Sequence, residues 1–210
     1  MRGVLAVVVV ATVLSACGSG SEQNPGEHHG NFKVQVSSSF PTRQKLAEQT
    51  EFVVSVKNTS GKTIPDIAVT VLNPKYQDTA QSFGMLIPPG GQGQPIVANR
   101  SRPVWIITQA PGPCEYSCHK GGPGGAATAY TDTWALGRLA PGRTARFAWK
   151  LTAVQAGTFG VEYQVAAGLN GYAKAVDASG APVSGRYTVT ISSRPQSTYV
   201  KSNGKVVYSP

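Results

Sequence analysis

The stretch from Arg146 to Leu151 (RFAWKL) decides the fold class, because its apolar and polar residues alternate along the chain. Successive side chains of a β-strand point to opposite faces of the sheet. The order therefore places Phe147, Trp149 and Leu151 on a dry face and the charged residues on the other. A strand with one dry face needs a second sheet to cover that face, so this window predicts two packed layers.

Five more windows show the same period of two, and they surround the first on both sides. They are residues 32–36, 51–57, 67–71, 161–165 and 187–191. Residues 104–107 (VWII) are apolar on both faces and predict a buried strand. The 24 glycines and 15 prolines disfavour a helix-rich fold, because both residue types interrupt helices. We therefore predict an all-β protein with an immunoglobulin-like antiparallel β-sandwich over residues 31–193.

Two pieces of this pattern resemble a known class of surface domain. Residues 52–61 (FVVSVKNTSG), followed by 67–71 (IAVTV), are similar to the first half of the immunoglobulin-like repeats of bacterial cell-adhesion-related proteins. Residues 136–142 (LGRLAPG) and 156–158 (AGT) resemble the second half. The resemblance implies the sandwich fold but says little about function, because it consists of turn residues. A long insertion rich in glycine and proline, about residues 73–130, separates the two halves.

The amino terminus carries the pattern of an export signal. A basic start (Met1-Arg2-Gly3) precedes the apolar run from Val4 to Leu14, which is too short to span a membrane but has the length of a signal-peptide core. The next residues, Leu14-Ser15-Ala16-Cys17, resemble the lipobox of bacterial lipoproteins. This resemblance implies a signal peptide over residues 1–16, a Cys17 carrying palmitate-type acyl chains, and a flexible tether over 17–30. The alternative is an ordinary signal peptide with a chance cysteine.

Export and lipidation predict a protein anchored on the extracytoplasmic face of the cell membrane. Acyl chains contribute about 0.8 kcal/mol per buried methylene, so two or more chains anchor stably. The formal net charge of +9 makes anionic lipid and acidic cell-wall polymer candidate partners, and another envelope protein is a third. The cations are scattered and the protein is exported, so nucleic acid is excluded as a partner.

The insertion contains the segment Cys114-Glu115-Tyr116-Ser117-Cys118-His119. If Cys17 is lipidated, two cysteines remain, and an oxidising envelope favours a Cys114–Cys118 disulfide. The alternative is a copper- or zinc-handling site made of Cys114, Cys118 and His119, because thiolates and imidazole are soft ligands.

The spacing of the two cysteines resembles that of copper-handling proteins of the respiratory envelope. The positions at which those proteins carry a further histidine and a methionine are Gly122 and Gly125 here, which weakens the resemblance. The segment also looks like a lengthened c-type haem attachment site, whose usual spacing has two residues between the cysteines. The disulfide is therefore our prediction, with no cofactor.

Enzyme motifs are missing from the sequence. It has no Gly-x-Ser-x-Gly elbow, phosphate-binding loop, dinucleotide fingerprint or His-Glu-x-x-His motif. His119 is the one histidine of the predicted body, so a serine–histidine–acid triad would depend on a loop residue. We predict that the protein is not an enzyme and that its domain has a binding or scaffolding role.

Aromatic residues outside the strands offer a second kind of candidate site. Trp134 and Tyr130 belong either to the core or to a binding platform. Tyr172 and Lys174 follow the turn at 168–171 and are expected near a loop end, where a carbohydrate- or peptide-binding face is an alternative.

The C-terminal segment, residues 194–210, predicts a separate β-hairpin. Within residues 197–208 (STYVKSNGKVVY), Asn203-Gly204 suits a two-residue type I′ turn. That turn would pair Ser202 with Lys205 and Val200 with Val207. A lone hairpin is marginally stable in water, so we expect it to dock on the sandwich or on a partner.

Overall fold

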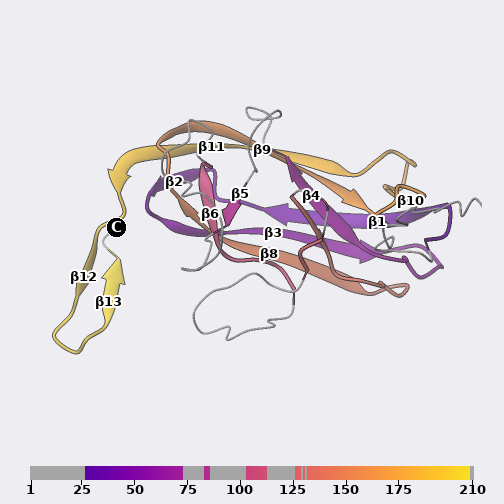
Figure 1. The fold of residues 1–210 in the computed structure, drawn as a ribbon, viewed down its shortest axis with the longest axis horizontal. Coiled ribbons are helices and arrows are strands. Elements are labelled where there is room, and N and C mark those ends of the chain that lie inside the picture. The colour runs from indigo at the N-terminus through magenta and orange to yellow at the C-terminus, as the bar shows by residue number, and fades with distance from the viewer. Residues whose placement is uncertain are drawn as a thin grey trace, which may run out of the picture.

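The computed structural model describes residues 27–72, 83–85, 103–112, 126–128, 130 and 132–208. Within these ranges the chain forms thirteen strands and no helix (Figure 1). Eleven of the strands belong to two sheets, and the last two form a hairpin of their own. The two sheets pack face to face around one hydrophobic core. The predicted all-β, immunoglobulin-like sandwich is confirmed.

The larger sheet has six strands in the order β10-β1-β3-β8-β6-β5. Their bounds are Ala173–Val176 (β10), Gly30–Ser39 (β1), Gln49–Asn58 (β3), Thr144–Ala153 (β8), Trp105–Gln109 (β6) and Phe83–Met85 (β5). The central pairs β1–β3, β3–β8 and β8–β6 are antiparallel, whereas the short edge strands β10 and β5 pair in parallel. Strands β5 and β6 come from the predicted insertion, and β6 confirms the buried strand expected at 104–107.

The smaller sheet has five strands in the order β2-β11-β9-β4-β7. Their bounds are Arg43–Leu46 (β2), Ser184–Pro195 (β11), Gly157–Ala166 (β9), Ala68–Leu72 (β4) and Thr133–Ala135 (β7). The edge strands of both sheets are only three or four residues long. Such short edges limit unwanted pairing with other chains.

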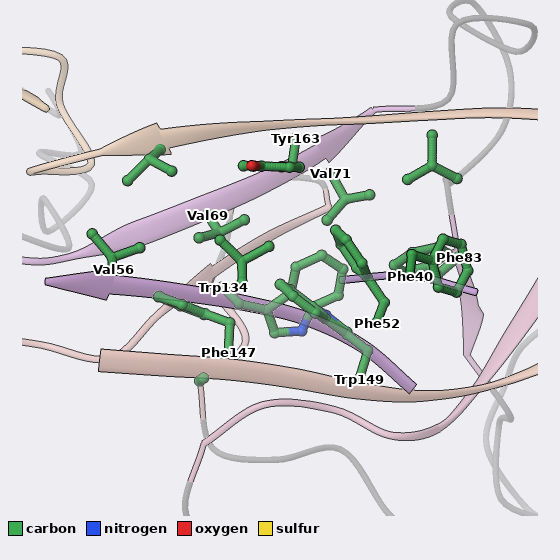
Figure 2. Close-up of a cluster of buried hydrophobic side chains, with 14 of the residues drawn as sticks. Phe40, Phe52, Val56, Val69, Val71, Phe83, Trp134, Phe147, Trp149 and Tyr163 are labelled. Carbon is green, nitrogen blue, oxygen red and sulfur yellow. The ribbon is translucent and has the colours of Figure 1, made fainter. Parts of the chain in front are cut away.

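The core follows directly from the period-two alternation. In β8, Phe147, Trp149 and Leu151 are fully buried, as the sequence predicts. Figure 2 shows the aromatic rings gathered between the sheets, where the ring centroid of Trp149 lies 5.0 Å from that of Phe52 in a stacked arrangement. Trp134 meets Trp149 edge-on with centroids 5.3 Å apart and is 4% exposed, so it belongs to the core and not to a binding platform.

Two polar contacts join elements across the interior. The indole Nε1 of Trp105 donates a hydrogen bond to Oε1 of Gln44 at 2.8 Å, and both side chains are buried. Ser38 Oγ on β1 lies 3.0 Å from the Tyr163 hydroxyl, which comes from the opposite sheet. Gly185 faces this tyrosine, because a Cβ there would come within 2.4 Å of its ring.

The C-terminal hairpin forms, but its register differs from the predicted one. Strands β12 (Thr198–Val200) and β13 (Val206–Tyr208) pair Val200 with Val206. Lys201 N donates to Lys205 O at 2.9 Å, which leaves a three-residue loop in place of the expected two-residue turn.

The backbone conformation of the loop explains the difference. A type I′ turn needs positive φ at both central residues, and here Gly204 has a φ of 78° while Asn203 does not lie in the positive region. Asn203 instead accepts a hydrogen bond from Lys205 N through its side-chain oxygen, at 3.1 Å. The hairpin extends from the end of β11 away from both sheets (Figure 1), so it does not dock on its own sandwich.

Candidate functional site

The site residues predicted from the sequence lie outside the described part of the chain. These residues are Cys17, Cys114, Cys118 and His119. Lipidation, the disulfide and the alternative copper or zinc site therefore stay predictions. Among the described residues, no group of three or more histidine, cysteine, aspartate or glutamate side chains could hold a metal ion. The described ranges also contain no helix long and apolar enough to cross a membrane.

One end of the sandwich gathers the polar features that the structure does describe. We call it the basal end, and it consists of residues 27–30 and the loops 59–67, 136–143 and 167–172. Strands β1, β8 and β10 begin here, and β3 and β9 end here (Figure 1). The chain therefore enters the fold at the basal end.

Asn58, the last residue of β3, holds two of these loops together. It is fully buried, and its side-chain amide donates to Lys62 O at 2.9 Å and to Leu139 O at 2.8 Å. Its Oδ1 accepts from both N and Oγ of Ser60, at 2.9 and 2.7 Å. Its main chain pairs with the 142–143 segment, where Arg143 O accepts from Asn58 N at 2.9 Å. Each hydrogen-bonding group of this buried residue is thus satisfied.

Five exposed cationic residues surround Asn58, and we call them the basal cluster. They are Lys33, Lys57, Lys62, Arg138 and Arg143. The main chain holds them in one neighbourhood, because Thr59 N donates to Lys33 O at 3.0 Å. Asn58, which follows Lys57, donates to the carbonyls of Lys62, Arg143 and Leu139, and Leu139 follows Arg138. The two ion pairs among the described residues, Arg146–Glu51 and Arg186–Glu162, include none of the five. No member of the cluster therefore forms an ion pair among the described residues.

The carboxylates at the basal end point toward backbone donors. Glu27 accepts from Asn170 N through Oε2 and from Ala173 N through Oε1, each at 2.7 Å. Gly168 makes room for this contact, because a Cβ there would lie 2.2 Å from the Glu27 carboxyl carbon. Asp66 accepts from Gly137 N at 2.9 Å.

Burial raises the pKa of Asp66, although the hydrogen bond from Gly137 lowers it and the negative charge of Glu27 raises it further. Both carboxylates therefore fasten loops in place and form no ion pair with the basal cluster.

Two half-exposed tyrosines lie at this end. Tyr172 is 48% exposed, and its ring centroid lies 4.4 Å from that of His29. Tyr130 is 47% exposed, and its hydroxyl donates to Asn170 Oδ1 at 3.5 Å. The structure thus brings Tyr130 to the loop that carries Tyr172, whereas it places Trp134 in the core. Lys174 is exposed on β10 beside them.

The opposite end of the molecule presents the hairpin. With the longest axis horizontal, Figure 1 shows the start of β1 at one end of this axis and β12–β13 at the other. Tyr199, Val200 and Val206 are 54%, 66% and 53% exposed. These three, with Tyr130 and Tyr172, are the most exposed large apolar side chains among the described residues.

Comparison with known proteins shows likeness in fold. The sequence matches no protein-family profile and no curated protein. The CARDB domain of the PF1109 protein from Pyrococcus furiosus is similar in structure, with 14% identity, a TM-score of 0.41, and coverage of 81% of this chain and 97% of that one. The PapD-like domain 7 of human CEP192 gives 9% identity, a TM-score of 0.35, and coverage of 93% and 100%. Likenesses this distant carry no argument about function.

Sequence reasoning missed the two residues that organise the basal end. Asn58 opens the sequence Asn-Thr-Ser-Gly, which is typical of a side chain that binds the backbone two residues ahead. The further bond to Leu139, 81 residues away, leaves no local signal. Glu27 lies in a polar segment without apolar residues, so nothing in its surroundings indicates its contact with the 170–173 backbone.

Proposed function

We propose that the protein is an exported, lipid-anchored component of the bacterial cell envelope. Its sandwich has a non-catalytic, scaffolding role and presents the C-terminal hairpin to an envelope partner. The observation that carries this proposal is the placement of the chain entry and the hairpin at opposite ends of the long axis (Figure 1).

The distances along the chain fit an anchor at the basal end. Cys17, the residue with the lipobox context, precedes Glu27 by ten residues, and Glu27 is bound to the basal loops. A ten-residue strand spans about 33 Å, and the central strands β1, β3 and β8, which run between the two ends, each have ten residues. A lipid on Cys17 would therefore keep the basal end close to the bilayer and the hairpin away from it.

The composition of the hairpin supports a role in contact with a partner. Tyr199, Val200 and Val206 expose apolar surface to water on this hairpin. An isolated two-stranded hairpin is only marginally stable in water. The segment 194–208 carries Arg194, Lys201 and Lys205 and no acidic residue. An envelope protein with an acidic and apolar surface would cover this hairpin and complement its charge.

The anchor is tested by replacing the lipidated residue. Cys17→Ser should move the protein from the membrane fraction to the soluble fraction after a high-salt wash, which screens electrostatic attachment. Ser15→Ala, which keeps the lipobox cysteine, is the matched control and should stay with membranes. If Cys17→Ser remained in the salt-washed membranes, the anchor would be refuted.

The orientation has its own test on lipid-anchored protein. A fluorophore at Gly61→Cys marks the basal end, and one at Ser202→Cys marks the hairpin loop, both in a Cys114→Ser/Cys118→Ser background. Quenchers attached to lipid headgroups should quench the label at 61 much more strongly than the label at 202. Equal quenching would contradict the proposed arrangement.

The two cysteines of the insertion give a further proposal, a Cys114–Cys118 disulfide. Its support is the oxidising compartment that export implies. Protein purified without reductant should then show no free thiols and no bound metal. Two free thiols with stoichiometric copper or zinc would contradict the disulfide and favour the alternative site with His119.

A further inference from the structure

We propose that the basal cluster binds the anionic headgroups of a phospholipid bilayer, so that the sandwich stands on the membrane by its basal end. This inference rests on the proposed function for the position of the membrane, and it names the lipid class that the basal end contacts. Its test uses unlipidated protein. Headgroup binding can therefore be refuted while the lipid anchor is confirmed, and the lipid anchor can be refuted while headgroup binding is confirmed.

The cluster is built into the fold and does not depend on mobile side-chain contacts. Lys33 belongs to β1, Lys57 to β3, and the other three members to the loops 59–67 and 136–143. Asn58 and its main-chain partners fix these segments relative to one another. Lys33, Lys62 and Arg143 form their hydrogen bonds among the described residues through main-chain atoms, which leaves their exposed side chains available for ligands.

The nearby acids form hydrogen bonds with neutral groups and no ion pair with the basal cluster. Both oxygens of the Glu27 carboxylate accept backbone N–H groups, and Asp66 is half-buried against Gly137. Asp177, on the turn after β10, accepts from N and Oγ of Ser179 in its own turn, at 2.8 and 2.6 Å. An external anion can therefore bind these cationic side chains without first breaking an ion pair among the described residues.

Two observations favour a bilayer over a soluble polyanion. The cluster lies where the chain enters the fold, which is the end nearest to Cys17 in sequence. Half-exposed Tyr130 and Tyr172 lie at the same end. Tyrosine rings with one apolar side and one polar tip are suited to the headgroup region of a membrane, and a wall polymer in water offers no such layer.

The test is vesicle sedimentation with the chain from residue 17 onward carrying Cys17→Ser, which retains every strand described above. It should bind vesicles that contain phosphatidylglycerol and not vesicles of pure phosphatidylcholine. Each cation near an anionic membrane contributes about fivefold in affinity, so Lys57→Gln/Lys62→Gln/Arg143→Gln should weaken binding by roughly 100-fold at low salt. Salt should weaken the wild type in the same direction.

The matched control removes three charges at the other end. Lys45→Gln/Lys201→Gln/Lys205→Gln has the same net charge as the first variant but should retain most of the binding. Equal losses in the two variants would show a non-specific charge effect and overturn the proposal. Binding to soluble polyphosphate or teichoic acid without binding to anionic vesicles would also overturn it, as would equal binding to both kinds of vesicle.

Discussion

Removing the Asn58 side chain should destabilise the whole sandwich, although the residue ends a strand beside a loop. Asn58→Ala deletes the bonds to Lys62 O and Leu139 O and the two bonds from Ser60. A buried hydrogen bond contributes about 1 kcal/mol net. The hydroxyl of Ser60 is partly accessible and can turn to water, so three bonds remain to be counted. The expected loss is about 3 kcal/mol of the free energy of unfolding.

Urea denaturation measures this loss. For a domain of this size the urea m-value is roughly 2 kcal/mol per molar, so the midpoint should fall by about 1.5 M. Asn31→Ala, at an exposed position of β1, is the matched control and should shift the midpoint by little. A change below about 0.5 kcal/mol for Asn58→Ala, the range of ordinary surface substitutions, would refute the reasoning.

Asn58→Asp tests the contribution of the amide donor of this side chain separately from that of its acceptor oxygen. It keeps the oxygen that Ser60 binds but replaces the amide donor with a carboxylate facing the carbonyl of Leu139. Full burial and the facing carbonyl raise the folded-state pKa of the introduced carboxyl more than the bonds from Ser60 and the exposed cations of the basal cluster lower it. The variant should therefore be most stable below the ordinary aspartate pKa and lose stability as the pH rises. A pH-independent midpoint difference from wild type would contradict this account.

Three further predictions concern the interior and one loop. Gln44→Ala leaves the indole N–H of Trp105 buried without a partner, which should cost about 1–3 kcal/mol in urea denaturation. Gly185→Val places a side chain against the ring of Tyr163 and should cost about 1–3 kcal/mol by overpacking, with a lowered melting temperature. Asp66→Asn should raise stability at neutral pH, because burial raises the pKa of Asp66 and its charged form is disfavoured in the folded state. The gain should shrink as the pH falls below the ordinary aspartate pKa.

Each of these predictions has a matched control. Gln49→Ala breaks an exposed bond to Thr108 and should change stability by under about 0.5 kcal/mol. Gly61→Ala adds a Cβ where nothing lies within 4 Å, so it should be tolerated. The control for Asp66→Asn is Asp177→Asn, because hydrogen bonds from Ser179 lower the pKa of Asp177. Asp177→Asn should be less stable than the wild type at neutral pH, and the difference should shrink in acid. Gains of the same sign for Asp66→Asn and Asp177→Asn would contradict the pH argument.

The strands of the sandwich were predictable because burial on one face imposes a period of two. The window around Trp149 predicts β8, and its buried side chains are those that the alternation places on the dry face. The pairing of β1 with β10 and of β2 with β11, both parallel, could not be predicted. These pairings join segments that are distant in sequence, and the alternation carries no information on which strand lies beside which.

The hairpin shows the same limit at a smaller scale. Its position was predictable from Asn203-Gly204, but its register was not. Asn203 can bind the backbone through its side chain in a three-residue loop as readily as it can adopt positive φ in a two-residue turn. One residue of difference in the loop length changes every cross-strand pair.

The basal end was less predictable than the fold. Composition indicates a basic protein, but the grouping of Lys33 with Arg143 depends on strands and loops that meet only in three dimensions. Similarly, the sequence does not show whether Trp134 belongs to the core or to a binding platform. Its edge-on contact with Trp149 in the structure shows that it belongs to the core.

The direction of β1 and β11 has a mechanical consequence. Both strands run from the basal end toward the hairpin, and each is held by neighbours along its length. A pulling force between a fixed N-terminal segment and a loaded hairpin would act along these two strands. The hydrogen bonds of the antiparallel pairs β1–β3 and β11–β9 lie perpendicular to that pull, so many of them must break together in shear. The sandwich is thus oriented to resist tension between its two ends.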